Sequence, residues 1–180
     1  MGVPLGEKQL DLFCRYYREI MSWNEKINLL SRSSSEDTLL KNFIDSLTAV
    51  QFLRERENRI LDMGSGGGFP GIPLKIACST LQVSLLEASR KKTSFLKHII
   101  RTLQLEKITV IHERAENLPD QESCRNSFDI VISKAAFKLP QFITLGASFL
   151  RPGGILMAMK GADISDELAA AQPAAAAAGE

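Results

Sequence analysis

Three glycines at alternating positions form the stretch of this sequence best suited to holding a ligand. Gly64, Gly66 and Gly68 follow the apolar run 60–63, and an apolar pattern resumes after Pro70, so we predict a strand, a tight loop and a helix. Glycine tolerates positive φ and has no Cβ to keep a ligand away from the main chain. Unpaired amides at the start of the helix would favour an anionic or polar ligand group. We therefore predict that this loop binds a ligand through its backbone.

The spacing of the glycines narrows the class of ligand. A dinucleotide fingerprint, G-x-G-x-x-G, would need a third glycine at position 69, which is Phe69. The observed order, Gly64-x-Gly66-x-Gly68, is similar to the pattern of S-adenosylmethionine-dependent methyltransferases. A tight strand-to-helix turn that binds nothing is the alternative interpretation.

An acidic residue follows the next apolar run. Residues 83–86 are mostly apolar and end in Glu87, about twenty residues beyond the loop, the position that binds ribose hydroxyls in doubly wound folds. A surface charge at a strand end is the alternative. Because the acid and the glycine loop occur together, we predict that Glu87 binds the ribose of a cofactor.

Composition limits the class of protein. The 180 residues suffice for one domain with a full core. The net charge of +1 is not strongly basic, so a nucleic acid would have to bind to a local patch of basic residues. The three cysteines include no C-x-x-C pair, and the two histidines lack metal-ligand spacing, so we expect reduced cysteines and no metal. We find no leader or membrane-spanning run and expect a cytoplasmic monomer without membrane contact.

The elements that must position these residues alternate from residue 59 onward. Apolar runs predict strands at 59–63, 83–87, 108–112, 128–133 and 155–160. Helical patterns predict helices at 71–78, 90–103 and 139–150. This alternation predicts an α/β fold with a Rossmann-like, doubly wound, mainly parallel sheet and a ligand crevice at the carboxyl ends of its strands.

Two segments flank the predicted cofactor domain, 59–161. Residues 1–58 form a helical lobe, with an amphipathic helix at 9–23 and a second helix that starts at the possible capping box Ser33-x-x-Glu36. Residues 162–180 are an alanine-rich, low-complexity tail without core-forming side chains. A sheet that ends with the strand at 155–160 would leave an open edge, so we expect this tail to be truncated or unusual.

Several short motifs between about residues 10 and 161 resemble one family. They are Trp23-Asn24, Asn28-Leu29, Asp45-Ser46-Leu47, the run from Asp62 to Pro73, Lys91-Lys92-x-x-Phe95-Leu96, Arg114-Ala115-Glu116 and Lys160-Gly161. They are similar to motifs of the bacterial 16S ribosomal RNA guanine-N7 methyltransferase family, also called glucose-inhibited division protein B. The run Gly-Phe-Pro-Gly-Ile-Pro is far more specific than a generic glycine loop.

The resemblance implies how S-adenosylmethionine is bound. Gly64 and Phe69 would border its methionine and adenosine parts, Glu87 would meet the ribose, and Ala115 and Glu116 would flank the adenine. By position alone, residues 114–116 follow a strand and could equally be an exposed polar loop. The full set of expected cofactor residues is Asp62, Gly64, Ser65, Gly66, Gly68, Phe69, Glu87, Ala115, Glu116 and Lys134.

Two departures from the family pattern concern the substrate. The family usually has Arg-His where this chain has Lys41-Asn42, and arginine where it has Lys134. Arginine offers a planar fork that lysine cannot copy, although the positive charge survives. We expect cofactor binding to persist and the departures to bear on RNA affinity or target choice.

Methyl transfer to guanine N7 makes few chemical demands. The nitrogen has a free lone pair and the sulfonium methyl is already activated, so neither a general base nor a metal is needed. Orientation can lower the barrier by roughly 7–11 kcal/mol. Mainly through the family match, Asp45 is our candidate to stabilise the cationic purine and Asn28 to bind the base edge. A helix-surface acid and a loop-capping amide are the alternatives.

The partner implied by the resemblance is 16S ribosomal RNA or the small ribosomal subunit. Basic side chains expected to contact it are Lys41, Arg90, Lys91, Lys92 and Lys160. Lys97 and Arg101 continue the same basic helix, whose charges could simply form its solvated side. Phosphate contacts of this kind would make RNA binding weaken steeply with salt.

Other functions stay open at this point. One keeps the cofactor but uses a different substrate, and another is a non-catalytic module whose cofactor site controls a partner surface. A nicotinamide oxidoreductase is the weakest alternative, because Phe69 breaks its glycine fingerprint.

Overall fold

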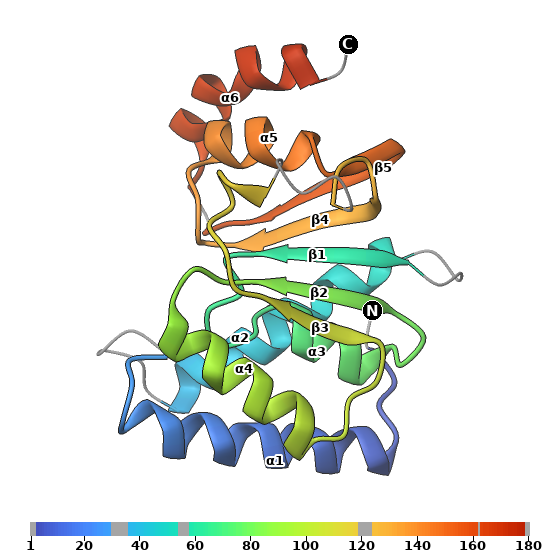
Figure 1. Cartoon of the computed structure of the whole chain (residues 1–180), viewed down its shortest axis with the longest axis vertical. Helices are drawn as coiled ribbons and strands as arrows, with labels where there is room; N and C mark the ends of the chain where they lie inside the picture. Colours follow the sequence, from blue (N-terminus) through green and yellow to red (C-terminus); the bar gives the residue numbers. More distant parts are fainter. Residues whose placement is uncertain (1–2, 30–35, 54–57, 119–123, 162, 179–180) are drawn as a thin grey trace.

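The structure, a computed structural model, describes residues 3–29, 36–53, 58–118, 124–161 and 163–178. Its centre is a five-stranded sheet in the order β3-β2-β1-β4-β5, with every neighbouring pair parallel (Figure 1). The strands are β1 Arg59–Met63, β2 Gln82–Leu86, β3 Ile108–Ile111, β4 Phe128–Lys134 and β5 Leu150–Met159. The predicted α/β class and parallel sheet are confirmed.

Helices cover both faces of the sheet. They are α1 Glu7–Asn24, α2 Glu36–Thr48, α3 Gly71–Ala77, α4 Arg90–Thr102, α5 Leu139–Ala147 and α6 Ser165–Ala178, with a short 3-10 turn, η1, at Ala49–Phe52. One hydrophobic cluster joins the first four helices to the sheet, and a second joins α5 and α6 to the opposite face. The central strand β1 explains why both faces are covered. Its residues Ile60, Leu61 and Met63 are apolar, alternate between the two faces and are fully buried.

The predicted boundaries are close except at β5. This strand begins at Leu150, whereas the sequence predicted a helix over 139–150 and a strand only from residue 155. Leu150 already pairs with Phe128, and the register then shifts before Ile155 pairs with Ile130. Proline and glycine are tolerated here because β5 lies at the edge of the described sheet.

The N-terminal segment is helical, as predicted, and shares the core of the sheet domain. Tyr16 and Ile20 of α1 are fully buried. Tyr16 stacks on Phe69 with ring centroids 5.7 Å apart and meets Phe43 of α2 edge-on at 5.4 Å. The capping residue predicted at Ser33 lies outside the described residues, and the division of the chain at residues 58 and 161 stays a prediction.

The C-terminal segment forms an ordered element of the structure. Helix α6 packs along α5 (Figure 1), and Ala171 is only 3% exposed within the second hydrophobic cluster. Alanine has no bulk beyond Cβ, so it lets two helices approach closely. The expectation that this tail contributes nothing to the core is therefore wrong.

No helix in the described part of the chain could traverse a lipid bilayer. Within the same ranges, no group of three or more His, Cys, Asp or Glu side chains could hold a metal ion, and the expectation that no metal takes part stays a prediction.

Candidate active site

The glycine loop between β1 and α3 has the backbone that its sequence predicts. Gly64, Gly66 and Gly68 have φ values of +73°, +57° and +97°. A Cβ on Gly64 would lie 2.6 Å from the Cβ of Ala136, in the segment after β4. Glycine is thus required at position 64 both by conformation and by the close approach of a second segment.

The backbone amides at the start of α3 are already paired. The N–H of Gly71 donates to Asp62 Oδ2 at 2.9 Å, and the N–H of Ile72 donates to the carbonyl of Gly68 at 2.8 Å. The prediction that unpaired amides at this helix start hold an anionic ligand group is therefore wrong. A buried carboxylate, which sequence alone did not place there, occupies the helix N-terminus.

Asp62 is a fully buried acid at the end of β1. Burial raises its pKa to about 8, against the opposing hydrogen bond from the Gly71 amide. Its Oδ2 holds α3, while its Oδ1 is buried and has no hydrogen-bond partner among the described residues. This oxygen can still form a hydrogen bond to a ligand, and a positively charged donor there would favour the ionised form of Asp62.

Glu87 lies directly after β2 and reaches the glycine loop. Its Oε2 accepts from the Gly66 amide at 2.9 Å and its Oε1 from the Ser89 amide at 2.7 Å, and the residue is only 9% exposed. Each carboxylate oxygen keeps a second lone pair, so two hydroxyl donors can still be bound. The predicted juxtaposition of Glu87 with the loop is present.

Two other residues of the loop serve its packing. The ring of Phe69 lies in the aromatic cluster with Tyr16 and Phe43, so only its backbone is left to border a cofactor. Ser65 is buried and donates to the Asp62 carbonyl at 2.9 Å. The ring packs in the core because three aromatic residues from distant segments converge there, and the expected place of Phe69 beside the cofactor stays a prediction.

Ala115 and Glu116 follow β3, as expected for residues on the crevice side. Ala115 is 5% exposed and packs in the second cluster. The exposed Glu116 accepts a hydrogen bond from Gln141 of α5 at 3.2 Å between Nε2 and Oε1. Its carboxylate thus stands at the surface between the β3 end and α5.

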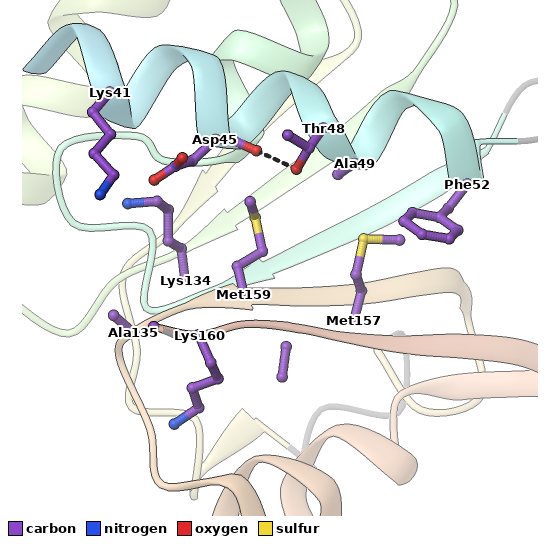
Figure 2. A pocket seen from close by; sticks show the side chains of 12 residues that line it. Lys41, Asp45, Thr48, Ala49, Phe52, Lys134, Ala135, Met157, Met159 and Lys160 are labelled. Carbon is purple, nitrogen blue, oxygen red and sulfur yellow. Dashed lines mark hydrogen bonds between the residues drawn. The ribbon is translucent and has the colours of Figure 1, made fainter. Parts of the chain in front are cut away.

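A cavity of about 580 Å³ opens between α2 and the carboxyl ends of β4 and β5 (Figure 2). Its lining residues are Lys41, Asp45, Thr48, Ala49, Phe52, Lys134, Ala135, Met157, Ala158, Met159, Lys160 and Gly161. Figure 2 shows Lys41 and Asp45 pointing toward Lys134. The cavity adjoins the glycine loop, since Ala135 lines it and the next residue contacts Gly64.

Lys134 lies in this cavity and not on the glycine loop. Its ammonium donates to Asn42 Oδ1 of α2. Burial lowers its pKa, as does Lys41, while the Asp45 carboxylate opposes the shift. The expected cofactor residue Lys134 is therefore placed with the expected substrate residues Lys41 and Asp45.

The remaining predicted residues are spread more widely. Lys160 points away from Lys134, donates to the Phe137 carbonyl at 2.6 Å and pairs with Glu167 of α6 at 2.6 Å. Asn28 is exposed in the segment after α1 and does not line the cavity. Arg90 and Lys91 are exposed and Lys92 is half-buried at the start of α4, beside the Glu87 site.

Three residues that support the site were not predicted as site residues from the sequence. Tyr16 donates to the Gly67 carbonyl and so links α1 to the glycine loop. Glu167 fixes Lys160, and Asn42 holds Lys134. Only Asn42 gave a signal in the sequence, as a departure from the family pattern.

Comparison with known proteins identifies the family. A family model described as rRNA small subunit methyltransferase G matches residues 9–180. The chain belongs to the rRNA small subunit methyltransferase G family. The match extends beyond residue 161, the last residue of the motifs that resemble the family, and so includes α6.

Curated relatives support this membership of the rRNA small subunit methyltransferase G family. The ribosomal RNA small subunit methyltransferase G of Syntrophus aciditrophicus (strain SB) is 47% identical over 167 residues, which are 92% of this chain and 69% of that protein. Its counterpart in Chloroflexus aggregans (strain MD-66 / DSM 9485) is 39% identical over 173 residues, 96% of this chain and 73% of that protein.

Solved structures agree on the fold. The O-methyltransferase from Bacillus cereus, in complex with SAH, has a TM-score of 0.61 at 22% identity and covers 80% of this chain and 65% of its own. Precorrin-6y C5,15-methyltransferase from Geobacter metallireducens GS-15 has a TM-score of 0.56 at 14% identity, with 83% and 74% covered. The sheet and its helices thus have the same Rossmann-like fold as these two structures.

Proposed function

We propose that this family member transfers a methyl group from S-adenosylmethionine to N7 of a guanosine in 16S ribosomal RNA. The observation that carries the proposal is the Glu87 carboxylate bound to the Gly66 amide at the ends of β1 and β2, in a chain of this family. The cavity beside the glycine loop supplies a place for the base.

The residues at the ends of β1 and β2 fit the cofactor. The loop at Gly64 and Gly66 leaves its backbone accessible, Glu87 retains lone pairs for two ribose hydroxyls, and Asp62 Oδ1 is a buried acceptor without a partner. An amino group of the cofactor would satisfy that oxygen. We therefore assign cofactor binding to the loop, Asp62 and Glu87, with Ala115 and Glu116 on the adenine side.

The chemical role of the chain is to orient the base toward the methyl group and to stabilise the positive charge that forms on the base. The cofactor supplies an activated methyl group, and guanine N7 supplies the lone pair. Phe52, Met157 and Met159 offer apolar contacts for a base in the cavity, and Asp45 lies where a carboxylate can stabilise the cationic purine product. We assign to Asn28 a contact with the base edge from outside the cavity lining.

We assign RNA contacts to basic side chains on two helices. Arg90, Lys91 and Lys92 begin α4 next to Glu87, and Lys41 stands at the cavity. Lys160 is the weakest member of the predicted set, because its ammonium is held by Glu167 and a carbonyl. We further propose that the protein acts as a cytoplasmic monomer on ribosomal RNA or the small subunit, without a metal.

Radiolabelled methyl transfer to small ribosomal subunits tests the proposal. Incubation with tritiated S-adenosylmethionine should label 16S RNA at one guanosine, which mass analysis of nuclease fragments identifies as 7-methylguanosine. Label on another molecule would favour a different substrate. Cofactor binding without transfer to any RNA would favour the non-catalytic module, and either result would overturn the proposal.

A further inference from the structure

Asn42 and Lys134, two residues from distant parts of the chain, touch each other in the structure. Asn42 of α2 and Lys134 at the end of β4 are 92 residues apart, yet the Lys134 ammonium donates to Asn42 Oδ1. In the sequence, the two residues stood out separately, in different motifs. Their contact indicates that they work as one unit.

The chemistry of lysine explains why a partner is needed. Arginine presents its donors in a rigid planar fork, whereas a lysine ammonium sits on a flexible stem and must be held by an acceptor. The Asn42 carboxamide oxygen is such an acceptor. Because an ammonium has three N–H donors, two remain for other groups after the bond to Asn42.

The charges around Lys134 come from both walls of the cavity. Helix α2 contributes Lys41 and Asp45, and the end of β5 contributes Lys160, whose charge is paired with Glu167. Figure 2 shows the Lys134 ammonium facing Asp45 and Lys41 with Lys160 directed elsewhere. Lys134 is therefore a donor held in place among these charges, and Asn42 is the residue that holds it.

We propose that Asn42 is a positioning residue that holds Lys134 so that its ammonium donates to O6 of the guanine, which makes the pair a determinant of base specificity. The inference rests on the proposed function. Guanine presents N7 and O6 side by side as acceptors, whereas adenine presents an amino donor next to N7. An ammonium at that position accepts guanine and repels adenine, while N7 stays free for the methyl group.

The electrostatics of Lys134 provides a test of this arrangement. Burial and Lys41 lower the pKa of Lys134, and Asp45 opposes them. The Asn42 oxygen stabilises the charged amine, so its removal should lower the Lys134 pKa further. The positioning role thus has a readout that does not depend on turnover.

A nuclear magnetic resonance titration of the full chain with 13C-labelled lysine measures this readout. The Lys134 signal, assigned by its loss in Lys134→Arg, should titrate at lower pH in Asn42→Ala than in the wild type. Gln51→Ala, an exposed change just after α2, is the matched control and should leave the signal in place. An unchanged Lys134 titration in Asn42→Ala would overturn the positioning role, whatever the RNA assays show.

A swap experiment on small ribosomal subunits measures the consequence for the reaction. Asn42→His and Lys134→Arg restore the residues of the family pattern one at a time. We expect each to lower kcat/KM by about tenfold, as for a lost hydrogen bond to a charged group, and the double variant to recover to within about threefold of the wild type. Single effects that simply multiply in the double variant would contradict the paired role.

Base choice is tested at the mapped guanosine. Replacement of that nucleotide by 2,6-diaminopurine keeps N7 and puts an amino group at position 6. Wild type should discriminate against it by about tenfold or more, and Asn42→Ala should lose most of that discrimination. Equal discrimination by the wild type and Asn42→Ala would overturn the specificity role. If the wild type transfers no methyl group to any ribosomal RNA, the proposed function is overturned. In that case the resonance titration still tests whether Asn42 positions Lys134.

Discussion

At the residue scale, the single carboxylate of Glu87 serves two roles at once. It ties the glycine loop to the start of α4 through Gly66 and Ser89, and it is the proposed ribose acceptor. The backbone bonds fix the carboxylate before a ligand arrives, so binding needs no rearrangement of this side chain. Such preorganisation lowers the cost of ordering the site.

Glu87→Gln should weaken binding of S-adenosylhomocysteine by about 1–3 kcal/mol, because a charged acceptor becomes a neutral one with a single oxygen. Isothermal titration calorimetry measures the change. Glu106→Gln, an exposed acid before β3, is the matched control and should bind as the wild type does. Equal affinity of Glu87→Gln and wild type would remove Glu87 from the cofactor site.

Asp62 should make stability depend on pH. Its folded pKa, about 8, lies above the ordinary value of 3.8, so the folded chain binds this proton more tightly than the unfolded chain does. The contribution of protonated Asp62 to the free energy of unfolding is therefore complete below pH 3.8 and is lost as the pH rises to about 8. Above that pH, Asp62 causes no further change in stability. Urea unfolding should show the wild type losing stability relative to Asp62→Asn between pH 5 and 8; a constant difference would show that Asp62 does not titrate there.

At the scale of elements, the β1-loop-α3 unit depends on a close backbone approach. The loop reverses the chain between a buried strand and a helix whose N-terminus is capped by Asp62. Gly64 lies against Ala136 of the segment that also borders the cavity. The glycine therefore couples the cofactor loop to the cavity wall.

Gly64→Ala and Gly153→Ala separate strain from crowding. Both glycines have nearly equal φ, +73° and +75°, but a Cβ on Gly153 meets nothing within 4 Å. We expect Gly153→Ala to cost about 1–2 kcal/mol from the left-handed conformation and Gly64→Ala about 1–3 kcal/mol more from overlap with Ala136. Chemical denaturation measures both, and equal losses would mean that the segment at Ala136 moves away without cost.

At the scale of the whole molecule, the N-terminal helices are part of the active-site scaffold. Helix α1 reaches the glycine loop through Tyr16, and α2 supplies Lys41, Asn42 and Asp45 to the cavity side. The cavity thus exists only where the helical segment meets the sheet. Cofactor loop and substrate cavity are built by different parts of one core.

Tyr16→Phe should lower the free energy of unfolding by about 1–3 kcal/mol, because the Gly67 carbonyl loses its buried donor. Tyr17→Phe, on the partly exposed side of the same helix, removes a hydrogen bond to Glu36 that water can replace, and should cost less than Tyr16→Phe. Urea denaturation of both variants decides this. Similar small losses would show that the Tyr16 hydroxyl does not tie α1 to the loop.

The sequence by itself determined the features that depend on neighbouring residues. Apolar runs set the strands, alternating glycines set the loop between β1 and α3, and the position of Glu87 after β2 followed from the regular spacing of a doubly wound sheet. The motifs in the run from Asp62 to Pro73 also indicated the family. Local backbone preferences and short-range periodicity suffice for these features.

Only the tertiary structure decided which distant side chains meet. It placed the Phe69 ring in the core, paired Lys160 with Glu167, closed the α3 N-terminus with Asp62, and joined Asn42 to Lys134 across 92 residues. A side chain's partner depends on how helices pack on the sheet, and that packing is a property of the whole core that no local pattern encodes.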